Sequence, residues 1–334
     1  MKNFALLVGI TYNSDETKKL LGPVNDVIMF RKYLLEKRYY DDKNISILRD
    51  DNINFLKPNR TNILNSLNKL INLANENNSD EVFFYFGGHG NSKNIKETYN
   101  SILTYDNDII EDADIRFLLE RLNNKTNMIM VFDCLNPTNN INLPYGYFNK
   151  NNIINCISNN SRQDIELMDK NIFLLTGTRN DNKTTAIQPY NVYYDMNVDL
   201  SILQKNKYGS IFTSSFLNYA YNNYTFEDII EFLQTVNTNN LGSNVILYSS
   251  QLKNTDFLNK LFAVQNIQPP VYEVQPTPNN QEELIKPKPK PNPTPNKIPS
   301  KPPIKKPKKN NSSHPSKNGT KNNASSAGKI IKRK

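Results

Sequence analysis

The chain has 334 residues, with 41 Lys and Arg against 32 Asp and Glu and a formal net charge of +9. The charge is uneven, because 15 basic residues and no acid follow from Lys286 onward, which leaves 26 bases against 32 acids in the rest. The basic balance therefore does not mark the folded part as a nucleic-acid-binding domain. Two cysteines exclude a disulfide framework, and the apolar run at residues 4–10 is too short to span a bilayer. We expect a soluble, cytoplasmic protein with free thiols and no membrane contact.

Short apolar runs alternate with helix-period segments through the first 262 residues. The runs predict strands at residues 4–9, 45–48, 81–86, 128–133, 172–176 and 245–248. Between them, amphipathic spacing predicts helices at 23–37, from 61 onward, from 112 or 114 to 122, at 210–221 and at 225–236. This alternation is typical of an α/β fold in which helices cover both faces of a mostly parallel sheet.

Two segments interrupt the alternation. Residues 148–169 are polar and weakly periodic, which indicates a surface connection between a larger and a smaller half. Beyond residue 262 prolines accumulate and alternate with lysines, which favours an extended, disordered tail. We therefore divide the chain into a larger region, a connecting loop, a smaller region that completes the same domain, and a basic tail, at residues 1–150, 151–170, 171–262 and 263–334.

His89 is the sole imidazole of the predicted folded part, because His314 lies in the tail. It follows a predicted strand within the glycine-rich sequence of residues 87–90, at the edge where parallel α/β sheets collect working side chains. The flanking glycines permit close backbone approach, which suits backbone N–H groups that meet a substrate carbonyl. A phosphate-binding loop is a competing interpretation, but no G-K-[ST] follows it. A turn with an incidental histidine is the simplest alternative.

The next apolar strand ends in Asp133-Cys134-Leu135, a second candidate for chemistry. Attack by a thiolate with an imidazole base requires this strand end and that of His89 to be neighbours. Cys156 lies in the polar connection and is read as an incidental thiol. Zinc is not expected, because neither the cysteines nor the histidines show paired ligand spacing.

Four segments resemble the metacaspases, the caspase relatives of plants, fungi and protists. They read ALLVGITY, VNDV, PNRTNI and FFYFGGHG at residues 5–12, 24–27, 58–63 and 83–90, in the family's order and spacing. The resemblance covers most of residues 1–252 and implies a caspase-type fold, with a large-subunit region at 1–150 and a small-subunit-like region at 171–262. It also implies cysteine endopeptidase activity, with His89 as the base and the Gly90 backbone N–H in an oxyanion hole.

The family's cysteine motif, F-D-x-C-H-S-G followed by L-P-[YF], is altered here. Phe132-Asp133 and residues 143–145 anchor its two sides without a gap, which puts Leu135 at the nucleophile position. Cys134 falls one residue early, and consecutive strand residues point to opposite faces, so its sulfur takes that position only through a bulge or shift. Losing the nucleophile costs on the order of 10⁶ in turnover in well-studied hydrolases.

The substrate-recognition positions also depart from the family pattern. The resemblance implies a preference for Arg or Lys before the scissile bond, which members of the family share. Only Asp106 remains of the first acidic motif, and Ile187 stands where the second has its acid. A pocket that pairs a cation needs a buried carboxylate, for which Asp106 and Asp181 are the surviving candidates. Many relatives need calcium, but no acidic cluster identifies such a site, and we expect no cofactor.

These observations support three hypotheses. The first is a metacaspase-like pseudoprotease with a regulatory or binding role, which pairs with an active caspase-like relative or captures peptide segments. The second is an active cysteine endopeptidase that uses His89 with Cys134. The third is nucleic-acid binding through the tail, whose basic clusters at 305–309 and 332–334 also fit a nuclear address or nonspecific contact with polyanions.

Overall fold

The computed structural model describes residues 2–92, 100–134, 141–150, 153–158, 167–177, 187–188, 209–221, 228, 230 and 245–262. The chain divides into two units, residues 1–272 and 273–334, and all described residues belong to the first. The predicted tail at 263–334 lies outside the described residues, as does most of the predicted helix at 225–236. Within the described ranges, no helix combines the length and apolar character needed to cross a membrane.

An eight-stranded sheet with the order β2-β1-β3-β7-β10-β13-β8-β9 forms the centre of this unit. The first five strands in that order run parallel, and β13, β8 and β9 are each antiparallel to their neighbours. The strands are β1 Phe4–Gly9, β2 Ile45–Arg49, β3 Glu81–Gly88, β7 Asn127–Cys134, β8 Tyr145–Lys150, β9 Ile153–Ser158, β10 Asn171–Gly177 and β13 Val245–Ser249. All six predicted strands are present, and the predicted α/β fold with a mostly parallel sheet is confirmed.

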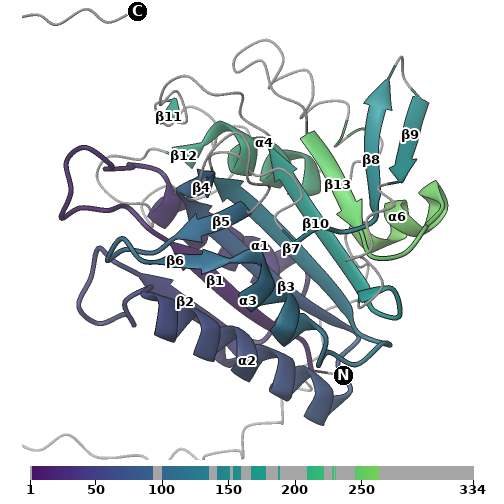
Figure 1. The fold of residues 1–334 in the computed structure, drawn as a ribbon, viewed down its shortest axis with the longest axis horizontal. Coiled ribbons are helices and arrows are strands. Elements are labelled where there is room, and N and C mark those ends of the chain that lie inside the picture. The colour runs from purple at the N-terminus through teal and green to yellow at the C-terminus, as the bar shows by residue number, and fades with distance from the viewer. Residues whose placement is uncertain are drawn as a thin grey trace, which may run out of the picture. The chain divides into compact units, whose positions relative to one another are not determined.

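Helices cover both faces of the sheet, and this explains why the central strands are apolar throughout. One face packs against α1 Pro23–Lys37, α4 Ile211–Tyr221 and α6 Thr255–Phe262. The other face packs against α2 Arg60–Asn77 and α3 Asp112–Leu119, which lie in front of the sheet in Figure 1. Side chains of β3 and β7 alternate between these two apolar layers, so each layer receives every second residue.

Residues 148–169, which were predicted to be a surface connection, contain strand structure in their first part. Strand β8 continues to Lys150, and β9 pairs with it as the edge of the sheet, in the register Tyr147↔Cys156. Strand β9 was not predicted because much of it is exposed, including Ile153 and Ile157, and an exposed edge strand does not require an apolar face.

The remaining elements are short. A three-stranded sheet contains β4 Gly90–Ser92, β5 Asn100–Leu103 and β6 Ile109–Glu111. A two-stranded sheet contains β11 Ile187–Gln188 and β12 Gly209–Ser210, and a 3-10 helix, η1, covers Asp42–Asn44. Helix α3 ends at Leu119, three residues before the predicted end, and α6 was not predicted.

Candidate active site

The two candidate strand ends are neighbours, as predicted. Strands β3 and β7 are paired in parallel, with Gly87 opposite Asp133 and Gly88 opposite Cys134. His89 follows β3 directly, so it leaves the sheet beside the last residue of β7. The next residue after β7 is Leu135, which lies outside the described residues.

His89 is held by its ring and by its backbone. Its Nε2 lies 2.6 Å from the carbonyl oxygen of Lys18, and its ring centroid is 4.7 Å from that of Tyr12. Because a carbonyl only accepts hydrogen bonds, Nε2 carries the proton and Nδ1 is the basic nitrogen of the neutral ring. The hydrogen bond to Lys18 therefore fixes the tautomer of the neutral ring, and the role of His89 as a base stays a prediction.

The two glycines before His89 make room for tyrosine hydroxyl groups on opposite faces of the sheet. A Cβ at Gly87 would lie 2.6 Å from the Tyr85 hydroxyl oxygen, and one at Gly88 would lie 3.0 Å from that of Tyr12. Close packing therefore explains these glycines without a ligand. Gly90 lies beyond His89 in β4, opposite Ile102, and its role in an oxyanion hole stays a prediction.

The Cys134 thiol is buried, with 2% of the residue exposed. It belongs to the apolar layer beneath α2 and α3, together with Phe132 of the same strand. Burial raises the pKa of the Tyr12 phenol, and the nearby Cys134 raises it further. The thiol therefore lies inside the domain near Tyr12. Cys156, in contrast, is exposed on β9, although partial desolvation raises the pKa of its thiol.

Two buried carboxylates lie on the other face of the sheet. Asp26 of α1 is 1% exposed and accepts the backbone N–H of Ser210 at 3.0 and 3.1 Å. Asp133 of β7 is 8% exposed and accepts the hydroxyl of Thr213 at 2.7 Å, which in turn lies 3.1 Å from the Tyr85 hydroxyl. Burial raises the pKa of Tyr85 well above its ordinary value, and the charges of Asp26 and Asp133 raise it further. Both carboxylates are therefore close to one phenol.

This acidic region also contains a buried hydroxyl. Ser210 Oγ has no hydrogen-bond partner among the described residues, although the residue is 6% exposed. A buried polar atom without a partner is costly, so such atoms are often satisfied by a ligand or water. Carboxylates and a hydroxyl are groups of the kind that accept hydrogen bonds from an ammonium or guanidinium group.

The sequence alone indicates no role for either buried carboxylate. Asp26 lies in the VNDV segment and Asp133 in the altered cysteine motif, and their alignment with family motifs is the only signal. Of the acids that were chosen, Asp106 is exposed in the turn between β5 and β6, where it accepts the hydroxyl of Thr104. Asp181 lies outside the described residues, and the binding roles of Asp106 and Asp181 stay predictions.

Among the residues that the structure describes, no group of three or more His, Cys, Asp or Glu side chains is placed to hold a metal ion.

Comparison with known proteins links this site to one family. Residues 3–144 match the family model for the metacaspase, peptidase C14 domain. Metacaspase-9 of Arabidopsis thaliana is 28% identical over 138 residues, which cover 40% of this chain and 42% of that protein. Metacaspase-1 of Plasmodium falciparum is 35% identical over 159 residues, which cover 43% of this chain and 25% of that protein. A solved structure of the Geobacter sulfurreducens protein GSU0716 has a TM-score of 0.49 and 12% identity, and covers 79% of this chain and 99% of that one.

The fold is an α/β domain with a mostly parallel sheet. Residues 3–144, which make up less than half of the chain, are similar to the metacaspase, peptidase C14 domain. The matches to the two metacaspases span less than half of their lengths.

Proposed function

We propose that this chain is a metacaspase-like pseudoprotease that binds peptide segments carrying a Lys or Arg side chain. The observation that carries the proposal is that the other site residues are present while the aligned nucleophile position has no thiol. His89 keeps its carbonyl partner and two buried acids remain, whereas the aligned nucleophile position holds Leu135. Leucine has no lone pair and cannot form a thioester.

The directions of the side chains at the end of β7 support the proposal that Cys134 does not act as a nucleophile. Asp133 bonds to Thr213 on the α4 side, whereas Cys134 joins the apolar layer on the α2 side. The thiol therefore shares its face with Phe132, and not with the carboxylate site. To reach the position aligned with Leu135, it would need a local rotation or a shift of the strand end.

The acidic region supports binding of a cationic side chain. A guanidinium or ammonium group bound by two buried carboxylates forms charge-assisted hydrogen bonds, which are about twice as strong as neutral ones. The bound segment would belong to another protein or to an active caspase-like relative. The chain would bind this segment without cleaving it.

Fluorescence polarisation tests the binding. A labelled peptide ending in Arg should bind the full chain, and a matched peptide ending in norleucine should bind at least about tenfold more weakly, since truncating one partner of a buried charge pair costs about 2–5 kcal/mol. Asp133→Asn should remove the preference for Arg. Asp108→Asn, which changes an exposed acid, is the matched control. Equal affinity for both peptides would reject the cation site, and Asp106→Asn tests the exposed acid chosen from the sequence.

An active cysteine endopeptidase is the second candidate, because Cys134 lies opposite Gly88 in the sheet and close to Tyr12, whose ring contacts that of His89. Fluorogenic peptides ending in Arg and Lys, assayed with and without calcium, distinguish the two. The pseudoprotease predicts no hydrolysis. Hydrolysis that disappears in Cys134→Ala would favour the endopeptidase.

A further inference from the structure

Tyr12 has an unusual backbone conformation for a buried tyrosine. Its φ is 52°, in the left-handed region, and it is 1% exposed. A non-glycine residue in this region costs on the order of 1–3 kcal/mol, so its surroundings must hold it there. Contacts of Tyr12 with its surroundings must therefore offset the energetic cost of this conformation.

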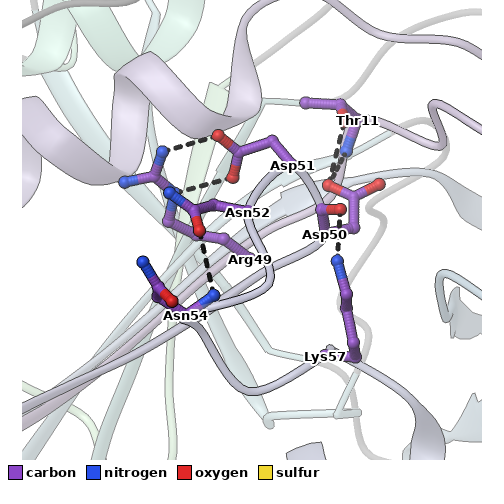
Figure 2. A network of polar contacts seen from close by, with 7 residues as sticks. All are labelled: Thr11, Arg49, Asp50, Asp51, Asn52, Asn54 and Lys57. Atoms are coloured by element: carbon purple, nitrogen blue, oxygen red, sulfur yellow. Dashed lines mark hydrogen bonds and ion pairs between the residues drawn. The ribbon is translucent and has the colours of Figure 1, made fainter.

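The Asp50 carboxylate provides such contacts. It directly follows β2 and accepts three hydrogen bonds from the chain just after β1: the Thr11 N–H at 2.8 Å, the Thr11 hydroxyl at 2.9 Å and the Tyr12 N–H at 2.7 Å. Figure 2 shows this carboxylate pointing at Thr11. The Lys57 ammonium donates to the Asp50 carbonyl oxygen at 2.7 Å, which fixes the Asp50 backbone as well.

The Tyr12 hydroxyl connects this arrangement to His89. It donates to the Leu103 carbonyl at 2.7 Å and accepts the His89 N–H at 2.9 Å. The Leu103 N–H donates to the His89 carbonyl at 2.9 Å, so both backbone groups of His89 are bonded. The Tyr12 ring also contacts the imidazole, with the two ring planes tilted by 42°. Displacing Tyr12 would thus remove a contact to the ring and one to the backbone of His89.

We propose that Asp50 is a positioning residue for His89, acting through Tyr12. Asp50 holds Tyr12 in its left-handed conformation, and Tyr12 holds the His89 backbone and ring so that Nε2 meets the Lys18 carbonyl. The connection runs from the end of β2, across the end of β1, to the end of β3. This proposal deepens the proposed function, because it rests on His89 belonging to the binding site.

The neighbouring acid provides a matched control. Asp51 pairs with Arg49 at 2.7 and 2.9 Å, and both side chains are nearly buried. Figure 2 shows this pair beside Asp50, with its guanidinium directed at Asp51. Asp50→Asn and Asp51→Asn remove the same charge from adjacent positions. Only the first removes an acceptor from the chain around Tyr12.

Nuclear magnetic resonance of the histidine rings tests the proposal. The chain has two histidines, so protein labelled with ¹⁵N-histidine gives two sets of ring signals, and His314→Ala assigns them. We expect His89 in the unaltered chain to show one protonated Nε2 and one unprotonated Nδ1. Asp50→Asn should shift the His89 signals towards the averaged tautomers of a free imidazole and broaden them. Asp51→Asn should leave them in place.

Two outcomes would overturn the proposal. One is a His89 ring spectrum unchanged in a folded Asp50→Asn variant, and the other is an equal change in Asp51→Asn. Should Asp50→Asn fail to fold, Tyr12→Phe tests the second half of the connection, since it keeps the contacts of Asp50 and the ring but loses the hydroxyl that accepts the His89 N–H. An unchanged His89 ring spectrum in that variant would also overturn the proposal. No peptide is present in this experiment. Its failure therefore leaves the peptide-binding proposal standing, and the absence of peptide binding would not alter the ring spectrum.

Discussion

Replacing Gly87 by alanine should destabilise the domain by crowding a buried hydroxyl. The new Cβ would lie 2.6 Å from the Tyr85 hydroxyl oxygen, which is too close, so the phenol must move by several tenths of an ångström. That movement stretches its 3.1 Å hydrogen bond to Thr213. Tyr85 is fully buried between β3 and the helices of its face, so little space is available for it.

The expected size follows from three contributions. Overpacking a core costs about 1–3 kcal/mol. A weakened buried hydrogen bond costs about 1 kcal/mol. Alanine is better than glycine within a strand by roughly 0.5–1 kcal/mol, which offsets part of the loss. We therefore expect the free energy of unfolding to fall by about 1–3 kcal/mol, measured by urea unfolding followed with circular dichroism.

A double-mutant cycle isolates the cause. Tyr85→Phe removes the hydroxyl, after which the nearest ring carbons lie 3.1 Å from the new Cβ and smaller movements accommodate it. Gly87→Ala should then cost less in the Tyr85→Phe background than in the unaltered chain, with a coupling of about 1–2 kcal/mol. Additive effects, within about 0.5 kcal/mol, would refute the argument that Gly87 makes room for this hydroxyl.

Three further predictions follow from burial and charge. Iodoacetamide should modify Cys156 but not Cys134 in the native chain, and both cysteines in urea, as measured by peptide mass mapping. Because burial raises the pKa of Cys156, its modification rate should still increase with pH above the point at which the rate of a free thiol levels off. Rapid modification of Cys134 in the native chain would contradict its burial. Glu81→Gln should cost about 3–5 kcal/mol in urea unfolding, because it leaves the buried Arg38 without its carboxylate, and a loss below about 1 kcal/mol would show that the pair contributes little. Deleting the chain from Lys286 onward should abolish DNA or RNA binding at low salt in an electrophoretic shift assay, and undiminished binding would place that site on the folded part.

The central strands were predictable from the sequence because they are buried on both faces. Residues 82–86 and 128–132 are continuous apolar runs, and the pairing of their strands puts His89 and Cys134 at one sheet edge. The hairpin of β8 and β9 was less visible, because its outer strand is exposed and lacks a recognisable alternation. The assignment of Leu135 to the nucleophile position rests only on the spacing of the family motif, which periodicity does not reveal, and it stays a prediction.

The rest of the site depends on contacts between distant parts of the chain. Asp26 is buried, and its carboxylate accepts the backbone N–H of Ser210, which lies 184 residues later in the chain. Asp50 holds Tyr12 from 38 residues away, and Tyr12 reaches His89 across a further 77. An acid in the first turn of a helix or after a strand has ordinary explanations in sequence, such as the helix dipole or a turn. Only the folded chain distinguishes Asp26 and Asp50 from those cases.

Intact-mass spectrometry with an Arg-terminated, thiol-directed peptide probe tests the central claim most directly. The probe is applied in a Cys156→Ser background, which removes the exposed thiol of β9. A domain that binds the peptide but offers no thiol at residue 135 predicts that this chain gains no probe mass, while adding Cys134→Ala and Leu135→Cys gives one adduct. A single covalent adduct on the unaltered chain, mapped to Cys134 and lost in His89→Ala, would contradict the claim and identify a working cysteine peptidase.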